Sequence, residues 1–242
     1  MTPTKSYYPN GTIEVEGFLV DNVQVGNWVF YHENGQVFSQ GQFDNNGNAV
    51  GVWTEYYLNG QKMYEAISEQ GNCFSLYNDN LQIINYWTEQ GELLICNGQG
   101  TLTTYFDNGN LKHKSIWVDN LKNGILREFY DNGKVNIEWN FKNGVRDGEA
   151  KIFHNNGNLY IQCFYDNGKS VGSCKEWYKN GQLCEDGFYK NEKYFMDNFW
   201  DDTGIQRLHK GNGYVIKKEG ADELDIYKQD FINYIMTKET RL

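Results

Sequence analysis

Residues Tyr31-His-Glu-Asn-Gly-Gln-Val37 and Phe153-His-Asn-Asn-Gly-Asn-Leu159 share one pattern: an aromatic ring, an Asn-Gly pair and then an aliphatic residue. The Gly positions recur mostly every 24 residues along the whole chain. The dipeptides that end in these glycines are Asn10-Gly11, Asn34-Gly35, Asn59-Gly60, Gln90-Gly91, Asn108-Gly109, Asn132-Gly133, Asn156-Gly157, Asn180-Gly181 and Thr203-Gly204. A fixed period of this length is typical of repeat architectures.

Two columns of residues precede these glycines. The ring column, four residues before each Gly, is Tyr7, Tyr31, Tyr56, Trp87, Tyr105, Phe129, Phe153, Trp177 and Trp200. The pre-turn column, one residue later, is Tyr8, His32, Tyr57, Thr88, Phe106, Tyr130, His154, Tyr178 and Asp201. Side chains alternate across a strand, so the two columns should lie on opposite faces. We expect the invariant ring column to be buried by packing and the more variable pre-turn column to be more exposed to solvent.

Each repeat has the composition of a β-hairpin. Asn-Gly tolerates positive φ, so each pair predicts a type I′ reversal between two short strands. A second turn follows within the unit at Asn46-Gly47, Asn123-Gly124, Asn143-Gly144 and Asn167-Gly168. Between the turns lie short segments rich in aromatic and β-branched residues, which favour strands. The predicted fold is all-β: an elongated, single-layer antiparallel β-hairpin repeat array over residues 1–220.

A longer duplication divides this array. Asn85-Tyr-Trp-Thr-Glu-Gln-Gly91 followed by Asn97-Gly-Gln-Gly100 matches Asn198-Phe-Trp-Asp-Asp-Thr-Gly204 followed by Lys210-Gly-Asn-Gly213, at an offset of 113 residues. We therefore expect two half-arrays, about 1–100 and 101–220. The variant units at 85–100 and 198–213 are interpreted either as caps or as binding loops.

The pattern changes after Gly220. Residues 221–242 lack Asn-Gly and place Leu224, Tyr227, Phe231, Tyr234 and Ile235 at helical spacing. We expect a short C-terminal amphipathic helix that caps the last strand edge, because an open edge invites aggregation.

The repeat consensus resembles the variant MORN repeat, the type found in bacterial proteins named as YwqK-family antitoxins. The best copies run from Tyr7 to Trp28, with Glu16-Gly17 and Gly26-Asn-Trp28, and from Tyr31 to Trp53, with Gln40-Gly41 and Gly51-Val-Trp53. Later copies depart, because Gly124-Ile-Leu126, Gly148-Glu-Ala150 and Gly172-Ser-Cys174 lack the Trp. The resemblance covers about residues 6–216. It implies protein scaffolding, lipid binding or, from the antitoxin label, masking of a toxin.

Composition narrows the functional classes. The formal net charge is −10, which repels nucleic acid and anionic lipid, so no nucleic-acid partner is expected and a basic partner is. No apolar run is long enough to span a membrane, and no leader precedes the array, so a cytoplasmic location is expected. A secreted form stays open if a leader has been lost. The five cysteines form no CxxC pair and are expected to be free thiols.

No catalytic, metal or cofactor motif is found, so we expect a protein that is not an enzyme and needs no cofactor. The first hypothesis is a cytoplasmic protein-binding repeat module, possible roles being an antitoxin or an immunity protein for a basic toxin. The predicted contact residues come from the pre-turn column: Tyr8, His32, Tyr57, Tyr130, His154 and Tyr178. The alternatives are a membrane-associated scaffold with a basic patch around Lys210, Lys217 and Lys218, and a carbohydrate-binding sheet.

The predicted array makes its shape testable. A repeat array of 242 residues should have a radius of gyration clearly above the roughly 18 Å expected for a compact domain of this length. Small-angle scattering in solution measures this quantity, and a value near the compact figure would contradict the elongated array.

Overall fold

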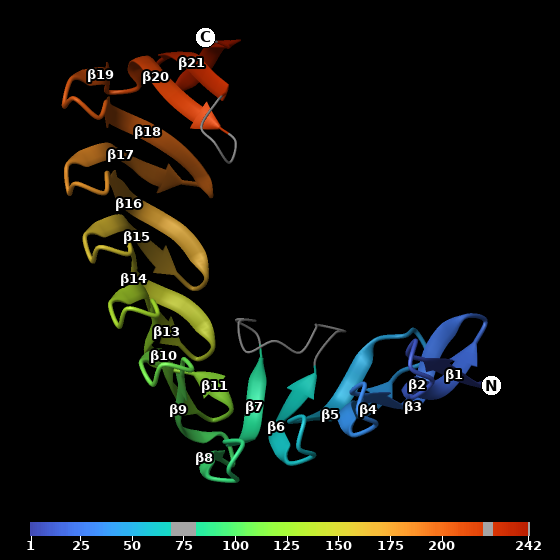
Figure 1. Cartoon of the computed structure of the whole chain (residues 1–242). Helices are drawn as coiled ribbons and strands as arrows, with labels where there is room; N and C mark the ends of the chain where they lie inside the picture. The colour runs from blue at the N-terminus through green and yellow to red at the C-terminus, as the bar shows by residue number, and fades with distance from the viewer. Residues whose placement is uncertain (69–80, 220–224, 242) are drawn as a thin grey trace. The chain divides into compact units, whose positions relative to one another are not determined.

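The computed structural model describes residues 1–68, 81–219 and 225–241, and within them every regular element is a β-strand (Figure 1). The strands are β1 (Thr2–Tyr7), β2 (Ile13–Val20), β3 (Val23–Tyr31), β4 (Val37–Phe43), β5 (Ala49–Tyr56), β6 (Lys62–Ser68), β7 (Gln82–Trp87), β8 (Leu93–Cys96), β9 (Gln99–Tyr105), β10 (Leu111–Val118), β11 (Leu121–Lys122), β12 (Gly124–Phe129), β13 (Val135–Lys142), β14 (Val145–Phe153), β15 (Leu159–Asp166), β16 (Lys169–Trp177), β17 (Leu183–Lys190), β18 (Lys193–Trp200), β19 (Gln206–His209), β20 (Asn212–Glu219), β21 (Asp225–Ile232) and β22 (Ile235–Arg241).

The strands form an antiparallel meander, which confirms the predicted all-β fold. From β1 to β9, and again from β14 to β22, each strand pairs with the next one along the chain. The chain divides into two compact units. Unit 1 comprises Met1–Thr104, Lys114–Gly124 and Asn143–Val145, and unit 2 comprises Tyr105–His113, Ile125–Lys142 and Arg146–Leu242.

Close packing of tryptophan on glycine organises the first repeats of unit 1. Trp28 and Trp53 are only 3% and 2% exposed. A Cβ atom added to Gly17 would lie 2.2 Å from the Trp28 ring, and one added to Gly41 would lie 2.1 Å from the Trp53 ring. Glycine is therefore required sterically at these two positions, since any side chain would collide with the indole of the following strand.

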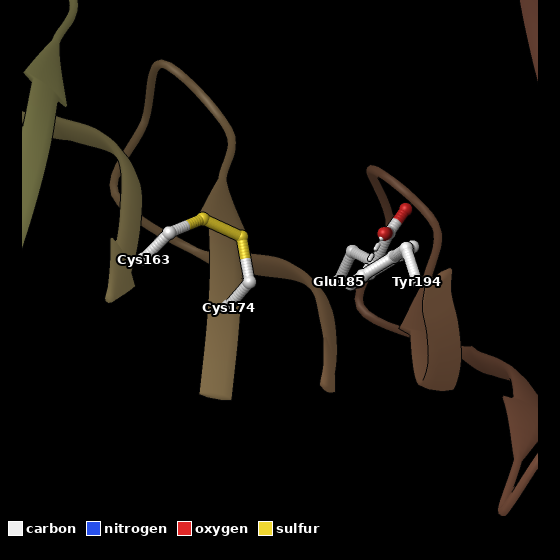
Figure 2. The surroundings of a disulfide bond; sticks show 4 residues. All are labelled: Cys163, Cys174, Glu185 and Tyr194. Atoms are coloured by element: carbon white, nitrogen blue, oxygen red, sulfur yellow. Dashed lines mark hydrogen bonds between the residues drawn. A yellow bond between two sulfur atoms is a disulfide. The ribbon is translucent and has the colours of Figure 1, made fainter. Parts of the chain in front are cut away.

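Later repeats have other residues at the two positions that Gly and Trp occupy in the first repeats. Leu126 and Ala150 stand where the earlier units have Trp, and both are buried. In the next unit, Cys163 of β15 takes the Gly position and Cys174 of β16 takes the Trp position, and the two form a disulfide with a Cα–Cα distance of 4.2 Å (Figure 2). The expectation of free thiols is wrong for this pair, because neighbouring antiparallel strands bring residues 11 apart in sequence face to face.

The remaining cysteines differ from one another. Cys96 is an exposed free thiol, and Cys184 is a buried one whose burial raises its pKa to about 11. Cys73 lies outside the described residues.

The two variant units supply the hydrophobic clusters of their units. Tyr86, Ile95 and Leu102 are buried in a cluster of unit 1 together with Tyr64 and Trp117. The residues 113 positions later, which are Phe199, Leu208 and Val215, are buried in a cluster of unit 2. The duplication is therefore structural: both units bury the same three positions of the variant repeat.

The predicted C-terminal helix is wrong over the described residues 225–241. These residues form the hairpin β21–β22, in which β21 pairs with β20 through seven residue pairs. The reversal is a two-residue turn at Asn233 and Tyr234, whose φ angles are 50° and 68°. The open edge of β20 satisfies the backbone of β21, and β-branched and aromatic residues favour the strand, so pairing overrides the helical spacing.

The Gly–Trp contact predicts a steep cost for a single methyl group. Gly41→Ala should lower the free energy of unfolding by about 1–3 kcal/mol, because the new Cβ overpacks the Trp53 site. Gln42→Ala, on the exposed neighbour, should change it by less than about 0.5 kcal/mol. Urea denaturation of both variants checks this, and equal losses would contradict the assigned contact.

Candidate binding surface

The turns that follow the ring column have a different geometry from the expected one. In the first, the Tyr8 amide donates to the Thr12 carbonyl at 2.9 Å, and the Gly11 amide donates to the Tyr8 carbonyl at 2.9 Å. Only the glycine has positive φ, at 87°. This is a three-residue loop in which a type I turn is followed by a left-handed glycine, and the type I′ prediction is wrong here.

Two-residue turns with both φ values positive occur at the opposite ends of the strands. Asn143-Gly144 has φ angles of 49° and 83°, and Asn167-Gly168 has 46° and 81°. Asp21 and Asn22 reverse the chain in the same way without a glycine. The second turn at Asn46-Gly47 differs, because only Gly47 has positive φ there.

An asparagine ladder joins six of the ring turns to the turn that follows each of them. The side-chain nitrogen of the turn Asn donates to a backbone carbonyl of the following repeat, and its oxygen accepts the amide two residues later. The donor bonds run from Asn10 to Glu33, Asn34 to Leu58, Asn59 to Glu89, Asn108 to Asp131, Asn132 to Asn155 and Asn156 to Lys179, at 2.7–3.3 Å. The backbone does not require Asn at this turn position, because φ is negative there. The recurrence of Asn was therefore the sequence signal for a role of its side chain.

The six predicted contact residues form a second ladder beside the first. Each side chain reaches the backbone carbonyl of the ring-column residue in the next repeat: Tyr8 to Tyr31, His32 to Tyr56, Tyr57 to Trp87, Tyr130 to Phe153, His154 to Trp177 and Tyr178 to Trp200. All six are half-buried. The pre-turn column was expected to be more exposed to solvent than the ring column. Its side chains instead link neighbouring repeats.

The ring column is less buried than expected. Tyr7 and Tyr105 are 58% and 62% exposed, and the other seven members are half-buried. The Tyr31 hydroxyl donates to the Glu16 carboxylate at 2.6 Å, and this bond raises the Tyr31 pKa to about 12. In unit 1 the rings of Tyr31 and Tyr56 come three residues after Trp28 and Trp53 on the same strands, so they lie on the opposite face, and we call the face that carries the ring column in either unit the ring face. Recurrence of a ring was misread as burial, because these rings lie at strand ends against polar side chains.

A row of polar side chains crosses the ring face of each unit. In unit 2, cross-strand pairing joins Lys151 to Gln162, Gln162 to Lys175, Lys175 to Asp186, Asp186 to Asn198 and Asn198 to His209. In unit 1, Lys5 pairs with Glu16 at 2.6 Å, and Gln40 donates to the Tyr56 hydroxyl at 2.7 Å. The ring face therefore combines rings with amide and charged groups.

The ring face of unit 1 carries a shallow groove over β3, β4 and β5. Its lining contains no charged side chain and is made up mainly of amide side chains, valines and a threonine. The lining residues are Asn27, Val29, Gln40, Gln42, Val50, Val52 and Thr54, together with Trp28 and Gly41. Val52 is 52% exposed, so the groove presents apolar area to solvent.

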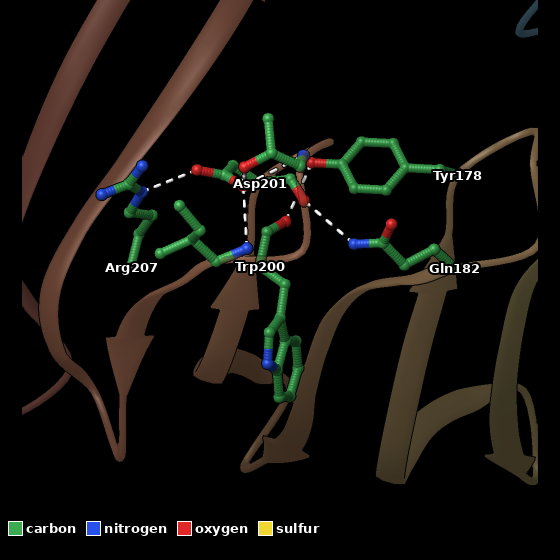
Figure 3. Close-up of polar contacts among 7 residues, drawn as sticks. Tyr178, Gln182, Trp200, Asp201 and Arg207 are labelled. Carbon is green, nitrogen blue, oxygen red and sulfur yellow. Dashed lines mark hydrogen bonds and ion pairs between the residues drawn. The ribbon is translucent and has the colours of Figure 1, made fainter.

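The last ring turn replaces the ladder ring with a carboxylate (Figure 3). Asp201 accepts the Thr203 and Ile205 amides and the Thr203 hydroxyl, and it pairs with Arg207 at 2.7 Å. The Thr203 hydroxyl makes the largest contribution to lowering the Asp201 pKa. The Asp201 carbonyl receives the Gln182 side-chain amide at 3.1 Å. Asp201 thus closes its own turn.

Most of the net negative charge of the chain belongs to unit 1. The sequence places 4 basic and 12 acidic residues in unit 1, a net charge of −8, and 18 basic and 20 acidic residues in unit 2, a net charge of −2. Among the residues of unit 1 that the structure describes, the exposed carboxylates are Glu14, Asp21, Glu33, Glu89, Glu92 and Asp119. The net charge of unit 1 is therefore the more negative of the two.

Two other kinds of site are absent from the described residues. Among them, no group of three or more His, Cys, Asp and Glu side chains could hold a metal ion. In this same part of the chain there is no helix with the length and apolar character needed to cross a bilayer. Lys210 is exposed beside Gly211, and the side chains of Lys217 and Lys218 lie outside those that the structure describes.

The ladder of pre-turn side chains predicts a measurable cost for one hydroxyl. Tyr130→Phe should lower the free energy of unfolding by about 0.5–1.5 kcal/mol, because it leaves the Phe153 carbonyl without its 2.6 Å donor. Tyr105→Phe, at a ring that is 62% exposed, is the control and should have little effect. If the two variants denature alike, the ladder does not stabilise the array.

Comparison with known proteins identifies the repeat. The family model described as MORN repeat variant matches seven segments, residues 3–21, 24–45, 49–68, 99–119, 122–143, 146–167 and 170–191, which together exceed half of the chain. No curated protein matches this chain. A solved structure titled "Crystal Structure of TcdB2-TccC3-Cdc42" is similar with 12% sequence identity and a TM-score of 0.18, over 94% of this chain and 12% of that one. The chain thus spans only a small part of that protein. It belongs to the MORN repeat variant family, whose repeats are non-catalytic modules that bind proteins or membranes.

Proposed function

We propose that this chain is a repeat module that binds a protein with a basic surface, and that unit 1 attracts this partner. The observation that carries the proposal is the unequal charge, with −8 in unit 1 and −2 in unit 2. Complementary charge raises the rate of encounter and selects against acidic partners. The same field disfavours anionic membranes, which makes a protein the better candidate than a lipid surface.

The ladders support this function by holding the surface rigid. Two side chains of the turn at 32–35, and two of the turn at 57–60, bond to the next repeat, so exposed turn residues such as Glu33 and Glu89 are fixed relative to one another. A surface that is ordered before binding loses less entropy on association. The pre-turn residues then serve mainly as scaffold, and their half-buried rings offer only part of their area to a partner.

Contacts after the encounter would come from the ring face of unit 1. Val52 and the half-buried rings Tyr31 and Tyr56 supply apolar area, and Gln40 and Gln42 supply hydrogen-bonding groups. Aromatic residues with neighbouring polar groups are the usual composition of well-packed protein contacts. An antitoxin or immunity role is a finer form of the same proposal, in which the basic partner is a toxin that this surface masks.

The groove favours a second candidate function, the binding of a neutral carbohydrate. Amide side chains beside aliphatic groups, with tyrosines nearby and no charge in the lining, suit hydroxyl-rich ligands. A screen against neutral and acidic oligosaccharides separates the two functions, since protein binding through charge predicts no glycan ligand.

Charge reversal at matched turn positions tests the main proposal. Glu33→Lys with Glu89→Lys alters two exposed turn residues of unit 1, and Asp131→Lys with Asp202→Lys alters the same turn position in unit 2. The partner is first captured from source cells on the intact chain and identified. The unit 1 pair should slow association with it by roughly 3- to 10-fold, and the unit 2 pair should have a clearly smaller effect. Stopped-flow or biosensor kinetics measures both rates.

Two results would refute the proposal. One is a captured partner with an acidic surface, and the other is an equal effect of the two pairs of substitutions. For the antitoxin form, co-expression of this chain should relieve the growth inhibition caused by the captured partner.

A further inference from the structure

We propose that Asn180-Gly181 is a site of spontaneous deamidation in the folded protein, and that the asparagine ladder protects the other six Asn-Gly ring turns. In this reaction the glycine nitrogen attacks the Asn side-chain carbon and expels the side-chain nitrogen as ammonia. Water then opens the cyclic imide to aspartate or isoaspartate. No redox partner is needed, and the product carries one additional negative charge.

The six ladder asparagines are held at both ends of the carboxamide. Asn156 shows the arrangement: its oxygen accepts the Asn158 amide at 3.0 Å, and its nitrogen donates to the Lys179 carbonyl at 2.7 Å. Attack by the glycine nitrogen requires the carboxamide to rotate and its nitrogen to leave. Both hydrogen bonds of Asn156 oppose that rotation, so the reaction must first break the bond from Asn156 to the next repeat.

Asn180 is held at one end alone. Its oxygen accepts the Gln182 amide at 3.0 Å, as in the other turns. Within the described residues its side-chain nitrogen has no hydrogen bond to the following repeat. There, the Gln182 side chain makes the link to the next turn without Asn180, by donating to the Asp201 carbonyl at 3.1 Å, whereas Asn156 and Asn158 both donate to the Lys179 carbonyl. The link between these two repeats therefore does not depend on Asn180.

Asn156 and Asn180 form a matched pair within the chain. Both side chains are exposed, and the glycines that follow have φ angles of 92° and 89°. Both glycine amides donate to the pre-turn carbonyl at 2.8 Å, so the attacking nitrogen is equally restrained. The two sites differ in the hydrogen bond of the leaving nitrogen, which isolates the effect of the ladder.

Deamidation would have different consequences at the two sites. A carboxylate at position 156 would place a negative oxygen against the Lys179 carbonyl in place of one of its two side-chain donors, which weakens the contact between the two turns although Asn158 still donates at 3.0 Å. At position 180 no carbonyl loses a donor, because Gln182 keeps its bond to Asp201. Asn180 can therefore change to an acidic residue while the array stays stacked, and this makes the edge of unit 2 more negative.

Peptide mapping of the aged protein tests the order of reactivity. The intact folded chain is incubated at mildly alkaline pH below its unfolding temperature, and the extent of deamidation at each ring turn is followed by mass spectrometry. Asn180 should react roughly 5-fold faster than Asn156, the factor expected for one ordinary hydrogen bond. In urea, where the ladder is absent, the two rates should converge. Equal rates in the folded chain, or an unchanged difference in urea, would overturn the proposal.

Two substitutions test the structural consequence separately. Asn156→Asp should lower the midpoint of thermal unfolding, and Asn180→Asp should leave it nearly unchanged. If both substitutions lower it equally, Asn180 takes part in the ladder, and this result would overturn the proposal.

Discussion

The array depends on hydrogen bonds from turn side chains to the backbone of the next repeat. Single hairpins are marginal in water, so stacking must supply the stability that one unit lacks. The turn asparagine and the pre-turn Tyr or His each place a donor on a carbonyl of the following turn, as in Asn132 to Asn155 and Tyr130 to Phe153. These bonds satisfy carbonyls at the strand ends and fix the spacing of successive turns.

The second constraint is steric and lies in the middle of the strands. A large residue on one strand needs a small neighbour on the strand before it, and Trp28 on Gly17 and Trp53 on Gly41 meet this need with minimal space. In one of the later repeats that lack this tryptophan, the same two positions hold the Cys163–Cys174 disulfide. A packing contact and a covalent bond thus occupy equivalent places in different repeats, and both join one strand to the next.

These constraints separate scaffold from surface. The ladders occupy the turn edge and the Gly–Trp pairs occupy one face, which leaves the ring face and the outermost turn residues for a partner. In unit 1 this surface combines exposed carboxylates such as Glu33 with the neutral groove around Gln40 and Val52. Charge can then govern encounter while amide and aromatic groups govern the close contact.

The sequence by itself determined the repeat, its 24-residue period, the all-β meander, the duplication at an offset of 113 residues and the net charge. All of these follow from local turn chemistry and from counting. Which face is buried followed only from tertiary structure, because the core face is set by the packing of Trp28 on Gly17 and of Trp53 on Gly41, which are contacts between neighbouring strands. The pairing of Cys163 with Cys174 and the reach of Tyr130 to Phe153 depend on strand register, which residue identity does not reveal. The C-terminal segment was misread for the same reason: Phe231 and Ile235 have helical spacing, but the edge of β20 offered unpaired backbone groups that only a strand could satisfy.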